Sequence, residues 1–400
     1  MANRYEEMIQ NEWEKFSDKN KMLPNIMLLG ATGCGKSSLI NLVFQKRLAP
    51  VNDNSRGTEG FETYWGKDHD MGVNLIDSRG YEMENGKGES FLEYSKSIRK
   101  KLKENHEKEP LAKIHIIWYC ISVAGKKIQD YDIEILKLLR KEDELKHRVA
   151  VVLTKCDEDD EEGNIAKEYK RILAEEVGED LPAFEVSTDL NLELDLKKMI
   201  TWSAEQLDDT DLKEAFIGSQ MISLKEKKET AAAKIGFYSL VAAGIGLTPI
   251  PMSDAVLLTP LQVTMSTHII YIYGMENYAD IPKALIGNIV VSNLGKAFAG
   301  GLLKLIPGIG TFAGGCINAG VASLITSAIG FAISELCYEG CKKIVEGEYQ
   351  DMTSVIDVGM IQKYVQEYMK DHKASKEIGV NKEAQEYAKK YIKEYKASEK

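Results

Sequence analysis

Short apolar runs recur through the first half of the chain, and most of them stop at a polar or glycine-containing motif. They are rich in branched and aromatic side chains and lack helical spacing, which is typical of strands buried inside a sheet. Six runs predict strands, at residues 25–29, 61–65, 73–76, 114–123, 149–153 and 183–186.

Amphipathic stretches separate these runs. Residues 36–45 place Leu39 and Val43 one helical turn apart, and the later stretches repeat such spacing. Strands and helices in alternation predict an α/β domain, in which a mostly parallel sheet is flanked by helices on both faces. In such sheets ligands bind at the carboxyl ends of the strands. Further helices are predicted at residues 89–104, 128–138 and 196–200.

The pattern changes after about residue 208. Leu212, Phe216 and Ile222 outline an amphipathic helix, and strand-like runs disappear. At 400 residues the chain is too long for one compact core. We therefore predict an all-α hydrophobic domain after the α/β domain. The predicted boundaries are an N-terminal helix at 1–21, an α/β domain at 22–208, a hydrophobic helical domain at 209–345 and a charged helical tail at 346–400.

The second half contains a stretch, residues 305–334, without any charged side chain. Its length passes the threshold for a transmembrane helix, but Pro307, several glycines and Asn318 interrupt it. The earlier run 235–247 is too short to span a bilayer, and residues 259–262 (TPLQ) predict a capped helix that starts there and ends near residue 274. Three alternatives stay open: a soluble bundle core, an inserted helical hairpin, or a bundle that opens onto a membrane surface.

Composition narrows the function. The net charge of −11 argues against nucleic-acid binding. The six cysteines form no CxxC pair and no zinc-ligand spacing, which favours reduced thiols in the cytoplasm. The first 16 residues are charged and lack the apolar core of a signal peptide.

Residues 30–37 read GATGCGKS, a P-loop motif that follows a predicted strand and opens a predicted helix. Backbone N–H groups and the helix N-terminus favour phosphate there. Lys36 is expected to reach the β- and γ-phosphates, and Ser37 to give its hydroxyl to Mg²⁺. The predicted nucleotide contacts in this motif are Gly30, Thr32, Gly33, Cys34, Gly35, Lys36, Ser37 and Ser38.

Two further motifs complete the predicted phosphate site. Asp77 opens the sequence DSRG after a strand, and its carboxylate is expected to hold Mg²⁺ through water, while the Gly80 N–H is expected to contact the γ-phosphate. Thr58, between glycines, is the candidate for closing onto Mg²⁺ and the γ-phosphate, with Thr63 as the weaker alternative. The predicted catalytic residues are thus Lys36, Thr58 and Gly80, and the predicted metal ligands are Ser37, Thr58 and Asp77.

The base motif follows the strand at 149–153 and reads TKCD. Asp157 can accept two hydrogen bonds from guanine, whereas adenine has no matching donor pair. The stem of Lys155 would cover the base, and Ser187 would offer its N–H to the guanine oxygen. Thr154 completes the motif.

These motifs, together with VST at 186–188, resemble the five nucleotide-binding motifs of Ras-like GTPases, and more closely those of the bacterial Era-like group. Residues 247–274 resemble the hydrophobic C-terminal module of YcjF-like GTPases, and the likeness covers residues 22–335. A fainter likeness joins the chain to immunity-related and dynamin-like GTPases, whose helical domains engage membranes.

Three departures from the family matter. Thr154 replaces an asparagine that bridges the base and the P-loop, which predicts lowered affinity. Tyr81 replaces the glutamine that positions water in Ras, which predicts slow hydrolysis. Gly33 replaces the asparagine of potassium-activated relatives, which argues against potassium stimulation.

The sequence therefore predicts a slow GTP hydrolase that uses GTP/GDP and Mg²⁺ as a switch for its helical domain. We expect a partner or a second copy of the chain to complete the site, with Arg56 and Arg79 as candidates for an arginine supplied in trans. The alternatives are a binding module that barely hydrolyses and a self-assembling membrane GTPase. The expected location is cytoplasmic, with peripheral membrane contact as an option.

Overall fold

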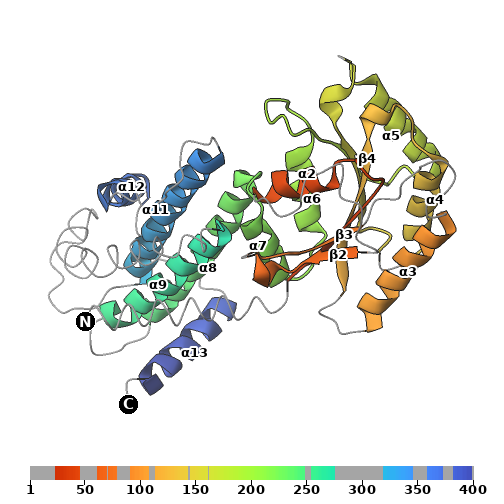
Figure 1. Cartoon of the computed structure of the whole chain (residues 1–400). Helices are drawn as coiled ribbons and strands as arrows, with labels where there is room; N and C mark the ends of the chain where they lie inside the picture. Colours follow the sequence, from red (N-terminus) through yellow and green to blue (C-terminus); the bar gives the residue numbers. More distant parts are fainter. Residues whose placement is uncertain are drawn as a thin grey trace. The chain divides into compact units, whose positions relative to one another are not determined.

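The computed structural model describes residues 23–45, 61–69, 71–78, 91–107, 113–142, 145–160, 162–247, 254–274, 319–345, 358–372 and 382–398 (Figure 1). The chain divides into two compact units between Ser223 and Leu224. The predicted boundary at residue 209 lies one helix earlier. The predicted N-terminal helix at 1–21 lies outside the described residues.

The first unit is built on one six-stranded sheet, in the order β2-β3-β1-β4-β5-β6. All neighbouring strands are parallel except β2 and β3, which pair antiparallel. This arrangement confirms the predicted mostly parallel sheet, with strand ends that differ by up to two residues. The strands are β1 (Asn25–Leu29), β2 (Phe61–Tyr64), β3 (Asn74–Ser78), β4 (Ile114–Ser122), β5 (Val149–Thr154) and β6 (Ala183–Glu185).

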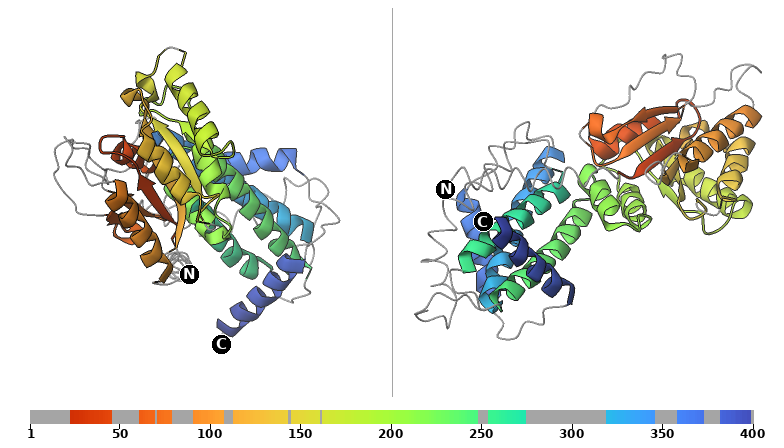
Figure 2. Two further views of the ribbon diagram at one scale, coloured as in Figure 1. Left: turned by 90° about the vertical axis from the view of Figure 1, so that its right-hand side faces the viewer. Right: turned by 90° about the horizontal axis from the view of Figure 1, so that it is seen from below.

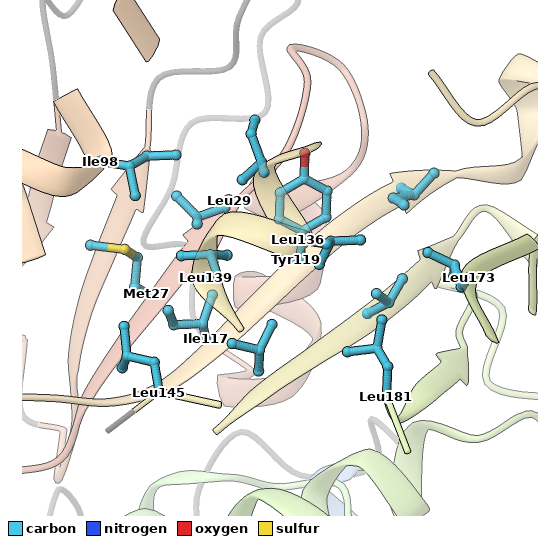
Figure 3. Close-up of a cluster of buried hydrophobic side chains, with 14 of the residues drawn as sticks. Met27, Leu29, Ile98, Ile117, Tyr119, Leu136, Leu139, Leu145, Leu173 and Leu181 are labelled. Atoms are coloured by element: carbon cyan, nitrogen blue, oxygen red, sulfur yellow. The ribbon is translucent and has the colours of Figure 1, made fainter. Parts of the chain in front are cut away.

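Helices cover both faces of the sheet because successive strand residues point to opposite sides. Met27 and Leu29 of β1 face a cluster formed with α3 (Phe91–Glu107), α4 (Asp130–Leu139) and α5 (Asn164–Glu176), shown in Figure 3.

The opposite face of the sheet packs against α2 (Lys36–Phe44) and α6 (Leu196–Glu205). Trp118 of β4 stacks on Phe44 with the ring centroids 6.5 Å apart, and its Nε1 donates to Ser203 Oγ at 3.0 Å. The double-sided burial explains why the strands read as continuous apolar runs.

One more helix, α7 (Thr210–Ser219), closes the first unit. Ser219 Oγ accepts the Gly72 N–H at 2.6 Å, and the Met221 N–H donates to the carbonyl of Val43. The helix predicted from Leu212, Phe216 and Ile222 therefore ends earlier than its apolar spacing indicated. Ile222 lies in a turn, because the buried Gln220 Oε1 accepts its N–H at 2.8 Å.

The described part of the second unit consists of helices (Figure 2). Three of them, α8 (Leu224–Gly246), α9 (Asp254–Ile272) and α11 (Ala319–Val345), pack against one another. The charged tail contributes α12 (Val358–Asp371) on α11 and α13 (Lys382–Ser398) on α8.

Buried or partly buried polar pairs join the three central helices. Tyr238 contacts His268 at 3.2 Å, and Ser239 contacts Ser327 at 2.7 Å. Tyr273 Oη and Ser334 Oγ lie 3.0 Å apart. These bonds satisfy polar side chains inside the bundle.

The helix predicted to begin at the TPLQ sequence begins earlier, at Asp254, so Pro260 lies inside α9 rather than at its first position. The additional turn carries Leu258, which is buried.

Among the described residues, only α11 is long and apolar enough to cross a membrane, and 78% of its most apolar window is buried within the structure. Residues 305–318 of the predicted charge-free stretch lie outside the described part of the chain.

Candidate nucleotide-binding site

The phosphate loop lies between β1 and α2, as the sequence predicts. Gly30, Gly33 and Gly35 have φ of 136°, 72° and 97°, values that residues with side chains rarely adopt. A Cβ atom at Gly30 would lie 2.3 Å from the carbonyl oxygen of Cys120, so only glycine fits there. At Gly33 the same atom would meet nothing within 4 Å, which leaves this side of the loop open for a ligand.

Lys36 is buried at the first position of α2, and its Nζ donates to the carbonyls of Gly30 and Ala31, each at 3.0 Å. The ammonium group is thus held inside the curve of the loop. Thr32 is exposed on the same loop, and Ser37 and Ser38 are half-buried in the first turn of α2. The structure brings all these predicted residues into one loop and helix start, where a helix N-terminus favours an anion.

Asp77 lies on β3, in register with Leu28 of the neighbouring strand β1. Its Oδ1 is buried and has no hydrogen-bond partner among the described residues. Burial raises the pKa of Asp77 to about 6; Lys36 lowers that pKa in part, and Glu62 on β2 raises it further. A buried, unpaired carboxylate oxygen beside a phosphate loop is suited to a hydrated cation.

The described residues contain no group of three or more His, Cys, Asp or Glu side chains that could enclose a metal ion. Mg²⁺ keeps several waters and takes only one or two protein oxygens. The Asp77 carboxylate and the Ser37 hydroxyl are the oxygen ligands that the described residues offer to Mg²⁺.

The base motif follows β5. Lys155 adopts φ of 56°, which turns the chain sharply so that Asp157 is exposed on the short helix η4 (Cys156–Glu158). The Ser187 hydroxyl donates to Asp157 Oδ1 at 2.6 Å and accepts the Asp189 N–H at 3.0 Å. The sequence indicated only a backbone role for Ser187, and this side-chain contact is an additional one.

Thr154 links the base motif to the phosphate loop. Its Oγ1 donates to the carbonyl of Cys34 at 2.5 Å and lies 3.4 Å from the carbonyl of Ile121. The threonine that stands in place of the family's asparagine therefore still contacts the phosphate loop, because β5 ends close enough for its short hydroxyl to reach. The predicted loss of affinity stays a prediction.

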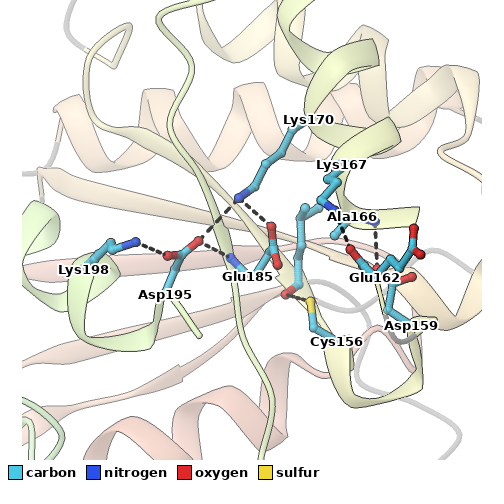
Figure 4. A network of polar contacts seen from close by, with 10 residues as sticks. Cys156, Asp159, Glu162, Ala166, Lys167, Lys170, Glu185, Asp195 and Lys198 are labelled. Carbon is cyan, nitrogen blue, oxygen red and sulfur yellow. Dashed lines mark hydrogen bonds and ion pairs between the residues drawn. The ribbon is translucent and has the colours of Figure 1, made fainter. Parts of the chain in front are cut away.

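An ion-pair network lies behind the base motif, and the sequence reasoning missed it (Figure 4). Lys170 of α5 contacts Glu185 at 2.7 Å and Asp195 at 3.4 Å, and Lys198 contacts Asp195 at 2.6 Å. Burial would raise the pKa of Asp195, but the hydrogen bonds and these two lysines lower it overall. The network fixes β6, which leads directly into Ser187.

The remaining predicted site residues, Thr58 and Gly80, lie outside the described residues, as do Arg56, Arg79 and Tyr81.

Residues 25–155 match the model of the 50S ribosome-binding GTPase family. The first unit is a P-loop GTPase domain. No relative emerges from the comparison with curated proteins.

Several solved structures resemble this GTPase domain. A probable GTP-binding protein EngB is 18% identical, with 46% of this chain and 97% of that chain covered and a TM-score of 0.33. Toc33 from Arabidopsis thaliana in complex with Mg²⁺ and GMPPNP is 14% identical, with 47% and 80% covered and a TM-score of 0.31. An Aquifex aeolicus Era variant bound to GDP·AlF4⁻ is 15% identical, with 52% and 68% covered and a TM-score of 0.32.

Proposed function

We propose that the GTPase domain binds GTP and GDP with Mg²⁺ and hydrolyses GTP slowly. The supporting observation is the hydrogen bond from Thr154 to the Cys34 carbonyl. It joins an open, anion-binding loop to an exposed carboxylate, Asp157, so that one ligand with phosphates at one end and a purine at the other can contact both.

At the phosphate end, Lys36 exchanges its two carbonyl partners for phosphate oxygens. Ser37 and Asp77 would hold Mg²⁺, and its hydration shell would give a partner to Asp77 Oδ1, which has none among the described residues. When bound, Mg²⁺ neutralises charge on the β- and γ-phosphates. Thr58 and Gly80 are assigned to the γ-phosphate from the sequence.

At the base end, the hydroxyl of Ser187 holds one oxygen of Asp157 in place. The carboxylate then accepts the ring N–H and the exocyclic amine of guanine, and the Lys155 stem covers the base. Adenine offers no such donor pair, so its nucleotides lose these bonds and leave a carboxylate unpaired.

Hydrolysis is slow in this proposal because Tyr81 cannot orient the attacking water as glutamine does. A second copy of the chain or another partner then completes the site. Single-turnover phosphate release at rising protein concentration tests this: a rate per molecule that is independent of concentration rules out self-activation, and no release at all supports the binding-module alternative.

Base recognition is tested by calorimetry with GDP, ADP and xanthosine diphosphate. Asp157→Asn replaces an acceptor by an amide, and xanthine carries a carbonyl where guanine carries its amine. The affinity of the variant for GDP should fall at least about 100-fold. Its affinity for xanthosine diphosphate should rise. Glu158→Gln, an exposed neighbour on the same short helix, is the matched control. Equal affinity of the unmodified protein for ADP and GDP would contradict the proposal.

For the second unit we propose a nucleotide-dependent role, with an Era-like GTPase repositioning a YcjF-like helical domain. The hydrogen-bonded polar pairs between α8, α9 and α11 favour a bundle that is folded in water and contacts a membrane surface only when it opens. Liposome flotation with GDP and with a GTP analogue tests that contact. Equal flotation in the two states would contradict the nucleotide dependence.

A further inference from the structure

Two cysteines from distant parts of the chain meet beneath the phosphate loop. Cys34 belongs to the loop, and Cys120 lies on β4, one residue beyond the pairing of Tyr119 with the last residue of β1. Both are buried, with 4% and 1% of their surfaces exposed, and both border the same point at Gly30, where a Cβ atom would meet Cys34 Sγ and the Cys120 backbone. Both are free thiols.

Gly30 makes this contact sterically feasible. A Cβ atom at this position would lie 2.9 Å from Cys34 Sγ as well as 2.3 Å from the Cys120 carbonyl oxygen. Any side chain at Gly30 would therefore occupy the space next to the sulfur of Cys34 and against the backbone of Cys120.

The surroundings make Cys34 the more acidic of the two thiols. The hydrogen bond from Cys120 lowers the pKa of Cys34 to about 7, and Lys36, whose Nζ lies 4.0 Å from the sulfur, adds to this against the effect of burial. The same contact and burial raise the pKa of Cys120 well above its usual range. A thiolate and a thiol placed side by side are the reactants for a disulfide.

We propose that Cys34 and Cys120 form a reversible thiol–disulfide site that closes the phosphate loop to nucleotide. The oxidant is of the peroxide class, small enough to enter beside Thr32 and Gly33, which are exposed next to Cys34.

The chemistry balances in two steps. The Cys34 thiolate attacks one oxygen of hydrogen peroxide, the O–O bond breaks, and the departing hydroxide takes a proton to become water. The sulfur of Cys120 then attacks the sulfenic sulfur of Cys34, so that an S–S bond forms and the S–O bond breaks. The second hydroxide leaves as water with the Cys120 proton. A dithiol reverses the reaction and is itself oxidised.

The disulfide would displace the loop because an S–S bond of about 2.05 Å is much shorter than a thiol hydrogen bond. Cys34 lies between Gly33 and Gly35, which both have positive φ and can absorb the movement. The Cys34 carbonyl is the acceptor of the Thr154 hydroxyl, so the movement also breaks the link to the base motif. This effect on nucleotide rests on the proposed function, whereas the disulfide itself does not.

The other cysteines of the described residues are poor competitors. Cys156 donates to the carbonyl of Leu153, and burial raises its pKa to about 12. Cys337 and Cys341 of α11 are both buried; burial raises the pKa of Cys337 well above the usual value, and the Cys341 thiol donates to the carbonyl of Tyr273 at 3.5 Å. Mild oxidation should therefore select Cys34.

The experiment uses the full-length reduced protein, treated with hydrogen peroxide and then catalase, denatured, alkylated and digested. Alkylatable thiols should fall from the six of the sequence to four, and a peptide pair joined through Cys34 and Cys120 should appear. The affinity for GDP with Mg²⁺ should fall at least about tenfold and return with dithiothreitol. Prior loading with GDP should slow the oxidation, because the ligand holds the loop open.

Two variants sharpen the result. Cys120→Ala should bind GDP normally when reduced and should give no joined peptide, and Cys120→Ser serves in its place if the alanine variant misfolds by circular dichroism. Cys341→Ser, a buried cysteine of the helical domain, should oxidise like the unmodified protein. A missing joined peptide in the oxidised protein, or a joined peptide with unchanged GDP affinity, overturns the proposal. Failure of the reduced protein to bind GDP overturns the proposed function instead, while the peptide readout still decides the disulfide.

Discussion

Each of the two units contains a buried lysine, and the two lysines have different roles. Lys36 in the GTPase domain donates to the carbonyls of Gly30 and Ala31, in a loop that is partly exposed. Lys227 in α8 is completely buried and donates to the carbonyl of Ile272, at the end of α9, at 3.3 Å. Both ammonium groups therefore rest on main-chain oxygens.

The difference lies in what can replace those oxygens. The partners of Lys36 are on a glycine-rich loop open at Gly33, so an anion can take their place. The carbonyl to which Lys227 donates lies at a helix C-terminus, where it has no acceptor role inside its own helix and carries the negative end of the dipole. A buried lysine thus indicates a binding site only where its partners are exchangeable.

The largest effect is expected from Lys36→Ala. Each charge-assisted bond from this ammonium to phosphate is worth about 1.5–3 kcal/mol, so the loss of two such bonds should lower GDP affinity at least about 100-fold. Calorimetry measures this, and circular dichroism should show the fold intact. The exposed Lys137→Ala, which removes only a surface pair with Glu176, is the control. Unchanged GDP binding by the Lys36 variant would contradict the assignment of Lys36 to the phosphates.

The second effect concerns Asp77 and pH. Burial raises the pKa of Asp77 to about 6 from an ordinary 3.8, so the folded state favours the protonated, neutral carboxyl group. As pH rises from 4 through 6, the folded state must bury the charge, and stability without ligand should fall by about 3 kcal/mol at most.

Asp77→Asn should remove this slope. The variant should be more stable than the unmodified protein at pH 7.5 and similar at pH 4, as measured by urea unfolding. Its GDP affinity should no longer respond to Mg²⁺. A parallel pH dependence in both proteins would show that the cost of burying Asp77 is small.

A third, intermediate effect is expected from Lys227→Met, which keeps the apolar stem and leaves the Ile272 carbonyl without this donor. An unpaired buried carbonyl costs about 1–3 kcal/mol. Urea unfolding followed through the helical signal should shift by that amount, and GDP affinity should not change. A loss of GDP affinity without destabilisation would mean that the two lysines are not as different as the structure indicates.

A smaller effect is expected from Thr154→Val, which keeps the shape and removes the hydroxyl that reaches the Cys34 carbonyl. The loss of one hydrogen bond should cost about 1 kcal/mol and lower GDP affinity roughly five- to tenfold. Thr154→Ser retains the hydroxyl and is the matched control. Thr154→Asn should raise affinity if threonine is the weaker residue at this position.

The smallest effect is expected from Lys170→Met, because its ion pairs with Glu185 and Asp195 are partly exposed. Such pairs contribute about 1 kcal/mol or less, so GDP affinity should fall two- to fivefold at most, and less at high salt. A salt-independent loss larger than this would place the network in direct contact with the base.

The sequence predicted the elements of the GTPase domain well and those of the helical domain less well. Strands β1 and β5 were predicted from apolar runs because both faces of the sheet are covered. In the helical domain, apolar residues occur around most of each helix, so spacing did not mark the ends. The start of α9 at Asp254 and the turn at Ile222 were therefore missed.

The phosphate loop and the carboxylate of Asp157 followed from the sequence alone, because glycines that permit positive φ, a helix start and a short turn are local requirements of the backbone. The partnerships within the site were decided only by the tertiary structure. The contacts of Thr154 with the Cys34 carbonyl and of Ser187 with Asp157 each join segments that are far apart in the chain. The tertiary structure likewise decided the burial of Asp77 Oδ1, which has no hydrogen-bond partner among the described residues. No local pattern encodes such contacts, because they depend on how neighbouring strands bring their ends together.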